Sequence, residues 1–266
     1  MVQQIKGVTK MFFKINVKKS QKKIFAFVFV GVLGLLLIFS LSSCVTIKID
    51  KLKGSGNIVI KEFDIDSFER LDFSGIGKII IKQDNVESLK VEAEDNIIKD
   101  LHIFNKGNTL FIGFKKNIIK VIPTRDIVFY LTVKNLEKIN ITGAGSIECD
   151  DIKLNSLSIN SSGAGNIKMY LTAEKLDINI SGAGKIELAG EVKTQKINIS
   201  GVGNYFAQEL VSNDCEIDIS GAGKAIVNVI QNLDVRLSGV GKVEYLGSPS
   251  VVQNISGVGG SVQKIE

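Results

Sequence analysis

The sequence repeats one short motif at a nearly constant spacing. Eight times a Ser or Thr is followed by Gly, one small or branched residue and a second Gly, the first glycines being residues 75, 143, 163, 182, 201, 221, 239 and 257. From Gly143 onward the motif returns every 18–20 residues. A short fixed period is typical of a solenoid or of another array built from one repeated unit. The repeat therefore constrains the fold more than the overall composition does.

Each repeat alternates apolar and polar residues on both sides of its glycines. In the unit at 176–188, apolar side chains stand at every second position before the glycines and again after them. This alternation predicts strands with one buried face, so each repeat reads as strand, glycine corner, strand and a third, variable piece. The same positions are apolar from one repeat to the next, as parallel in-register coils require.

We therefore predict an all-β fold: a right-handed single-stranded parallel β-helix, or β-solenoid, with about 18–20 residues per coil. A meander of antiparallel hairpins is the alternative, because the period of a strand does not fix its direction. The glycines are expected at the corners, where Gly adopts left-handed conformations without steric cost and where stacked backbones leave no room for a Cβ. These structural corners are Gly143, Gly145, Gly163, Gly165, Gly182, Gly184, Gly201, Gly203, Gly221, Gly223, Gly239, Gly241, Gly257 and Gly259.

Residues 85–138 break the repeat. They contain a polar stretch at 94–96, a turn signal at 105–108 and an apolar run at 110–114. The end of an array exposes its core and needs an atypical layer to cover it. We predict one β-solenoid domain at 54–262, with an irregular N-terminal capping layer at 54–138 and regular Gly-x-Gly coils at 139–262.

The start of the chain has the features of a bacterial export signal. Seven Lys and no acidic residue precede Cys44, and an uncharged apolar run spans 24–41. Leu41-Ser-Ser-Cys44 resembles the bacterial lipobox, whose cysteine is diacylated and becomes the new N-terminus. We predict a lipoprotein signal peptide at 1–43, lipid attachment at Cys44, and a lipidated N-terminus and short linker at 44–53. An uncleaved transmembrane anchor is the alternative, and translation from Met11 instead of Met1 is left open.

One outward column is a candidate for ligand contact. Three residues before the first glycine of each motif stand amides that could pair with a repeating polymer: Asn140, Asn160, Asn179, Asn198 and Asn254. The alternative is that these amides solubilise the surface or hydrogen-bond to one another in ladders. Asp218 and Arg236 interrupt the column on adjacent coils and are candidates for an ion pair.

The sequence offers little for catalysis, metals or cofactors. The only histidine, His102, has no nucleophile or second base placed beside it by the repeat. Cys149 and Cys215 lie more than three coils apart, so we expect two free, buried thiols and neither a disulfide nor a metal site. The glycine motifs match neither a nucleotide-binding fingerprint nor a calcium-binding repeat. We predict no cofactor and no enzymatic activity.

Charge excludes one further class of partner. The net charge of +5 comes from the leader, and without its seven Lys the chain has 26 basic and 28 acidic residues. We therefore expect no nucleic-acid partner, whereas the oligomeric state is not fixed by the sequence. A β-helix polysaccharide lyase or hydrolase is the alternative function, but its carboxylates must meet in one groove. The charges five residues before the glycines are scattered.

The leader, the cap and the repeats together resemble one family. The lipobox, the opening Gly54-Ser-Gly-Asn-Ile58 and the serial Ser-Gly-Ala-Gly-Lys/Asn-Ile units are similar to those of the family described as putative auto-transporter adhesin, head GIN domain, over about residues 54–262. The resemblance implies a β-solenoid lipoprotein of a Gram-negative envelope and brings no catalytic residues. We therefore predict an exported protein, anchored by lipid at the outer membrane or cell surface, that acts as a non-enzymatic, adhesin-like binding protein or scaffold. Its expected partners are the membrane and a glycan or envelope protein.

Overall fold

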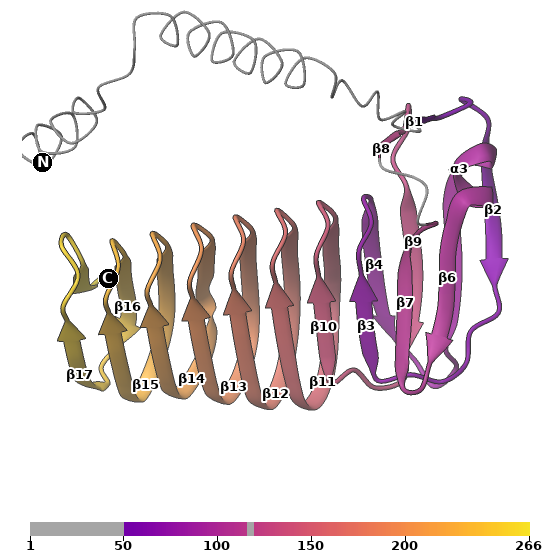
Figure 1. The fold of residues 1–266 in the computed structure, drawn as a ribbon. Coiled ribbons are helices and arrows are strands. Elements are labelled where there is room, and N and C mark those ends of the chain that lie inside the picture. The colour runs from indigo at the N-terminus through magenta and orange to yellow at the C-terminus, as the bar shows by residue number, and fades with distance from the viewer. Residues whose placement is uncertain (1–50, 116–119) are drawn as a thin grey trace, which may run out of the picture. The chain divides into compact units, whose positions relative to one another are not determined.

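The structure of this chain is a computed structural model that describes residues 51–115 and 120–266 (Figure 1). The leader and Cys44, on which the export and lipidation predictions depend, lie outside the described residues. Across the described ranges, no helix has both the length and the apolar character needed to cross a membrane.

Strands make up nearly all of the regular structure. In chain order the elements are β1 (Lys51–Lys53), β2 (Ile58–Phe63), β3 (Arg70–Phe73), β4 (Lys78–Gln83), β5 (Ser88–Glu94), α3 (Asp95–Asp100), β6 (Leu101–Lys106), β7 (Thr109–Phe114), β8 (Lys120–Ile122), β9 (Val128–Val133), β10 (Lys138–Ile141), β11 (Ser146–Ser161), β12 (Asn166–Ile180), β13 (Lys185–Ile199), β14 (Asn204–Ile219), β15 (Lys224–Leu237), β16 (Lys242–Gly247), β17 (Ser250–Ile255) and β18 (Ser261–Lys264).

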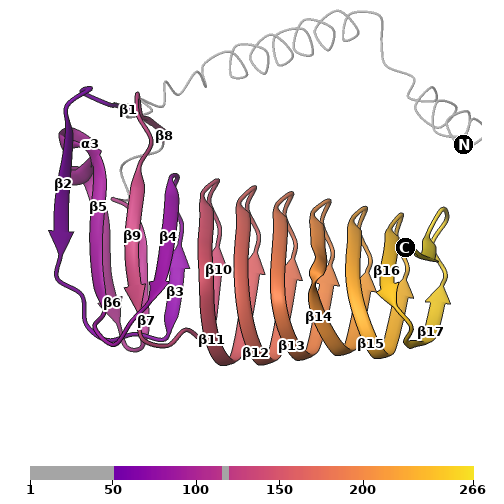
Figure 2. The ribbon, with the colours of Figure 1, turned by 180° about the vertical axis from the view of Figure 1, so that it is seen from behind.

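The repeats form flattened coils stacked along one axis (Figures 1 and 2). Strand β12 pairs in parallel with β11 on one side and with β13 on the other, over nearly its whole length. The stack makes about 7 turns. In Figure 1 the chain runs upward along the near side of the coils while successive coils step to the left, which is a right-handed winding. The predicted β-solenoid is confirmed, and the antiparallel alternative is wrong for the repeats.

The third, variable piece of each repeat is also strand. In the middle of the stack one strand continues from one glycine corner to the next and bends at the opposite edge of the coil, as β12 does from Asn166 to Ile180. The bends absorb differences in repeat length by register shifts, for example between Glu187 and Ala189 of β13. Such bulges let coils of unequal length keep their glycine corners aligned.

The apolar columns fill the interior of the coils. Ile178, Ile197 and Ile217 stand opposite one another in the register, and each is 0% exposed. Burying one such side chain stabilises the fold by about 1.5–3 kcal/mol. Because each coil stacks its apolar residues on those of the next, one continuous core runs along the solenoid axis.

The corners need glycine because the coils approach closely. A Cβ on Gly182 would overlap the carbonyl oxygen of Gly163 in the preceding corner. That carbonyl accepts a hydrogen bond from the backbone N–H of Ala183 at 3.1 Å, so the corners continue the ladder of the sheets. Among the predicted corner glycines only Gly259 has a positive φ, of 89°. Close approach of the coils, and not a left-handed backbone, is therefore what requires glycine at most of these corners.

The regular coils begin earlier than predicted. Strands β3 and β4 flank Gly75 and Gly77 and pair in parallel with β10 and β11. The first coil of the array therefore lies at Arg70–Gln83, inside the segment that the sequence assigned to the cap. Of the rest of the cap, β2 precedes this coil, and the elements from β5 to β9 are inserted between it and β10. The motif at Gly75 stands 68 residues before the next one, outside the regular period, and for that reason the sequence analysis placed it in the cap.

The cap contains the antiparallel strands of the domain. Strand β5 pairs antiparallel with β2 and β9, and β6 and β7 form a hairpin. The turn of this hairpin contains Gly107, with φ of 56°, at the turn signal read from the sequence. Strands β7 and β9 join the cap to the first coil, because they run parallel to β3 and β4.

A buried carboxylate holds the outer part of the cap together. Glu94, at the end of β5, is 1% exposed. It accepts hydrogen bonds from the Gly56 N–H at 2.7 Å, the Thr124 N–H at 3.0 Å and the Thr124 hydroxyl at 2.7 Å. These bonds, the Thr124 hydroxyl first, hold the pKa of Glu94 below its ordinary value. Sequence reasoning did not single out this residue.

Candidate binding surface

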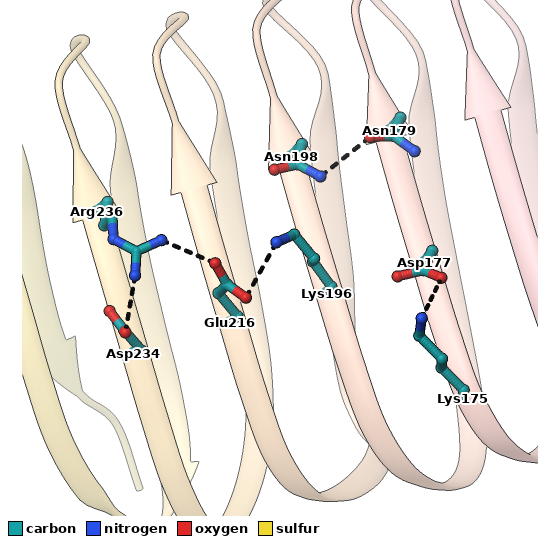
Figure 3. Close-up of polar contacts among 8 residues, drawn as sticks. All are labelled: Lys175, Asp177, Asn179, Lys196, Asn198, Glu216, Asp234 and Arg236. Atoms are coloured by element: carbon teal, nitrogen blue, oxygen red, sulfur yellow. Dashed lines mark hydrogen bonds and ion pairs between the residues drawn. The ribbon is translucent and has the colours of Figure 1, made fainter.

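Each flattened coil presents two outward faces. We call the strand surface that leads into the glycine corners the pre-glycine face, and the surface that follows them the post-glycine face. The predicted Asn column lies on the pre-glycine face, which is nearer the viewer in Figure 3.

Four residues of the Asn column form a hydrogen-bonded ladder. The side-chain amide of Asn160 donates to the oxygen of Asn140 at 2.9 Å, Asn179 donates to Asn160 at 3.0 Å, and Asn198 donates to Asn179 at 3.0 Å. All four are half-buried. An amide has two N–H donors and an oxygen with two lone pairs, so within the ladder each inner residue keeps one N–H and one acceptor position free. The structure therefore contains the ladder that was the alternative to ligand contact.

The Asn column includes one residue more than predicted at its N-terminal end, whereas its C-terminal member does not take part in the ladder. Asp72 of β3 stands opposite Asn140 and accepts a hydrogen bond from it at 3.4 Å. Sequence reasoning missed Asp72, although it also lies three residues before a first glycine, Gly75. Asn254 is in register with the column through Arg236 but is exposed on β17. The structure thus brings Asn140, Asn160, Asn179 and Asn198 together and leaves Asn254 apart.

An ion-pair chain replaces the ladder farther along the same face (Figure 3). Glu216 of β14 lies between Lys196 at 3.1 Å and Arg236 at 2.8 Å, and Arg236 also contacts Asp234 at 3.1 Å. The two cations hold the pKa of Glu216 below its ordinary value. The expected pairing of Arg236 with Asp218 is wrong, because the guanidinium pairs with Glu216 and Asp234 instead. These two carboxylates stand five residues before a first glycine, in the column next to the Asn column.

A shallow hollow of about 420 Å³ lies on the post-glycine face. Tyr170 of β12 lines it and is 50% exposed, and Ala189 stands opposite Tyr170 in the register. The small side chain of Ala189 leaves one side of the tyrosine ring open. We call this site the Tyr170 hollow; its lining also includes Glu148, Asp150, Lys168, Glu187, Phe206, Gln208 and Glu209.

Two carboxylates of the Tyr170 hollow are held by lysines from neighbouring positions. Glu148 pairs with Lys78 at 2.7 Å, and Glu187 pairs with Lys185. The ammonium of Lys185 also lies 5.3 Å from the centre of the Phe206 ring. The hollow thus combines a half-exposed aromatic face with oriented hydrogen-bond acceptors, which suits a ligand that has both apolar faces and hydroxyl groups.

The sequence contained a signal for this hollow that was not used. Glu148 and Glu187 stand five residues after a first glycine, and Asp150 and Tyr170 stand seven after one. The scattered charges noted in the sequence are those of a column before the glycines, whereas these carboxylates stand in columns after them. Glu209 could not be assigned to a column from the sequence, because a register shift between β13 and β14 places it opposite Ala189.

The remaining candidate residues are separate from this surface. Cys149 and Cys215 are free and buried, as predicted, and burial raises the pKa of Cys149 to about 11. His102 is exposed on β6, where its ring lies 4.5 Å from that of Phe104. Within residues 51–115 and 120–266, no group of three or more His, Cys, Asp or Glu side chains is arranged to hold a metal ion.

Comparisons with solved structures show the same fold in other bacterial proteins. A putative adhesin from Bacteroides fragilis is 27% identical, with a TM-score of 0.76, covering 80% of this chain and 100% of that one. A putative lipid binding protein from Parabacteroides distasonis is 25% identical, with a TM-score of 0.69, covering 82% and 100%. A putative adhesin from Parabacteroides merdae, at 23% identity and a TM-score of 0.65 over 82% and 100%, shows likeness of fold alone. No curated protein matches the chain.

A family model extends the likeness from fold to sequence. It matches residues 67–249, from just before the first coil at Arg70–Gln83 to the start of the last one. The match therefore includes the glycine corners from Gly143 to Gly241, the Asn ladder and the Tyr170 hollow. The chain belongs to the adhesin-like family described as putative auto-transporter adhesin, head GIN domain.

Proposed function

We propose that this chain is a lipid-anchored protein of the bacterial envelope that binds a carbohydrate polymer, without catalysis, on the post-glycine face of its solenoid. Membership of an adhesin-like family supports a binding role at the cell surface. Two relatives of known structure are named as a putative adhesin and a putative lipid binding protein. The basic and apolar leader followed by Leu-Ser-Ser-Cys44 supports export and lipid attachment.

The observation that carries the ligand class is the exposed ring of Tyr170 beside Ala189. A large aromatic side chain that is 50% exposed on a flat sheet presents a surface for apolar contact. A pyranose ring has an apolar C–H face that packs on such a ring, and hydroxyl groups that donate to carboxylates at its rim. Glu148 and Glu187 are suited to accept these bonds, since their lysine partners already orient them.

The geometry of the stack favours a polymer over a single sugar. Coils repeat at about 4.8 Å along the axis, and the hollow extends from Glu148 on β11 to Glu209 on β14. A chain of sugar units lying along the axis would therefore meet Tyr170 and Phe206 in succession. Rigid strands hold these contacts in place, so little conformational entropy is lost when the ligand binds.

We assign the Asn column to the stability of the stack and not to the ligand. Its four stacked amides already hydrogen-bond to one another across the coils. Ladders of identical amides are a recurrent way of holding parallel in-register strands together. Within the repeats at 139–262, the pre-glycine face has no exposed aromatic side chain comparable to Tyr170, and the exposed ring of Phe104 next to this sheet belongs to the cap strand β6.

A glycan array with the purified chain tests the ligand class. We expect capture of at least one polysaccharide, and Tyr170→Ala should weaken its binding by about tenfold, or about 1.4 kcal/mol. Phe104→Ala, which removes a 38% exposed aromatic ring from the cap, is the matched control and should leave binding unchanged, because β6 and β7 extend the sheet of the other face. An array without captured glycans would contradict the carbohydrate proposal.

A second set of variants tests which face binds. Charge substitutions at Asn160, Asn179 and Asn198 should leave capture intact as long as circular dichroism shows a folded protein. Loss of capture in these variants, with normal capture by Tyr170→Ala, would move the site to the pre-glycine face. The captured polysaccharide should also be analysed for new chain ends, because their appearance would show cleavage and favour the lyase or hydrolase alternative.

A further inference from the structure

The last coil leaves both of its strands with an unpaired edge. Strand β17 pairs with β15, and β18 pairs with β16; neither has a second partner among the described strands. Figure 1 shows β17 at the end of the stack, opposite the cap. A row of free backbone N–H and C=O groups along a strand is a template for pairing with another strand.

The core is also open at this end. Ile255 of β17 is 41% exposed, whereas its counterparts in the two preceding coils, Leu237 and Ile219, are 1% and 0% exposed. An array normally ends in a layer with a polar outer surface, and this coil instead presents interior positions to solvent.

The opposite end of the domain differs in charge. The outer strands of the cap carry charged residues that discourage edge pairing, including Lys61 and Glu62 on β2 and Lys106 on β6. Strand β17, Ser-Val-Val-Gln-Asn-Ile, carries no charge. A copy of the cap is therefore a poor match for the edge of β17, and an uncharged strand edge is a good one; on β18 the one charged residue, Lys264, stands at the end of the strand.

We propose that the last coil is an interface for a second copy of this chain, joined end to end about a two-fold axis. Strands β17 and β18 lie on opposite faces of the coil, and a two-fold axis perpendicular to those faces sets each antiparallel to its own counterpart. Both free edges are then paired by one operation, which makes the contact self-complementary. The exposed Ile255 side chains of the two copies are covered in the same step.

Gln253 supports a second copy as the occupant. It occupies the inward position that Val235 fills in the preceding coil, and it is exposed. An amide is both a donor and an acceptor, so it can pair with the same amide of another molecule, which a carboxylate or an ammonium cannot do. A polar side chain at an otherwise apolar position therefore fits an interface between identical ends.

The molar mass of the full chain in detergent, measured by analytical ultracentrifugation over a concentration series, tests the proposal. We expect the protein mass to rise with concentration from that of one chain to twice that value. Gln253→Lys places like charges opposite each other and should raise the dissociation constant at least tenfold. Ile230→Lys, an equally drastic change at a 54% exposed site on β15, is the matched control and should leave it unchanged.

Mixing variants distinguishes a two-fold contact from other association. Gln253→Lys and Gln253→Glu should each be monomeric, and an equimolar mixture should recover the dimer because the two charges then oppose each other. Circular dichroism of each variant checks that it is folded. A parent that stays monomeric at every concentration, or a Gln253→Lys variant that associates as tightly as the parent, would overturn the proposal. Neither result depends on glycan binding.

Discussion

The absence of a Cβ at the corner glycines allows successive coils to approach closely. The first glycine of each corner lies against the carbonyl of the preceding corner, where a Cβ would overlap the oxygen. The residue between the two glycines points outward instead and varies between Ala and Val from Ala144 to Val258. Two adjacent positions of one corner therefore have opposite tolerance for a side chain.

This contrast gives a matched pair of substitutions in one corner. Gly182→Val should lower the free energy of unfolding by about 3 kcal/mol or more, because its Cβ would overlap the carbonyl oxygen of Gly163. That oxygen is held in place by the hydrogen bond from the Ala183 N–H. Ala183→Val should change stability by less than about 0.5 kcal/mol, since the next coil has Val202 at this position. Chemical denaturation measures both. Equal stability of the two variants would remove close approach as the reason for glycine.

Glu94 makes the stability of the cap depend on pH. Its carboxylate is stabilised in the folded state, so its folded pKa lies below the unfolded value of about 4.3. The stabilisation is complete above the unfolded pKa and is lost as the pH falls through the lower, folded pKa. Glu94→Gln should therefore be less stable than the parent at pH 7, and the difference should shrink towards pH 3. Denaturation at several pH values measures it; a difference independent of pH would contradict the account.

At the scale of elements, a buried polar cluster joins three successive coils. The hydroxyl of Tyr205 on β14 donates to Gln195 of β13 at 2.7 Å, and the amide of Gln195 donates to Ser212 at 2.7 Å. The Ser212 hydroxyl in turn donates to the backbone carbonyl of Asn228 on β15 at 3.1 Å. Burial raises the pKa of Tyr205 well above its ordinary value, which keeps the hydroxyl protonated as a donor.

Removing one hydroxyl from this cluster should be costly. Tyr205→Phe leaves the buried oxygen of Gln195 without its donor, which should destabilise the fold by about 1–3 kcal/mol. Tyr245→Phe, at a half-buried position of β16, is the control and should cost less than about 0.5 kcal/mol. Thermal melting of both variants compares them. A Tyr205→Phe variant as stable as the control would show that the cluster contributes nothing net.

The elements that repeat could be predicted from sequence, and the elements that do not repeat could not. A period of 18–20 residues fixes the coils, their corners and the outward Asn column, because each position recurs above its counterpart. The cap occurs once, so no column reveals that β7 and β9 align with the first coil. The Tyr170 hollow depends on side chains from successive coils after the corner and on the register shift beside Ala189. The position of such a bulge cannot be read from the spacing of the glycine motifs.

At the scale of the whole molecule, the lipid anchor is the most direct prediction to test. Cys44→Ser removes the thiol that would be acylated, so the variant should lose labelling by a fatty-acid probe and leave the membrane fraction. Cys149→Ser, which alters a buried thiol of the solenoid, should keep the label. Membrane association of the Cys44→Ser variant would favour an uncleaved transmembrane anchor instead.

The parallel stack also determines how the protein would respond to a pulling force. Each middle coil makes its main contacts with the coils beside it, so tension between an N-terminal tether and a second copy held at the last coil would act on one interface at a time. A detached coil of 18–20 residues would lengthen the chain by about 65 Å. Single-molecule extension should therefore show a series of nearly equal steps, which would let a tethered cell yield gradually under shear before the attachment fails.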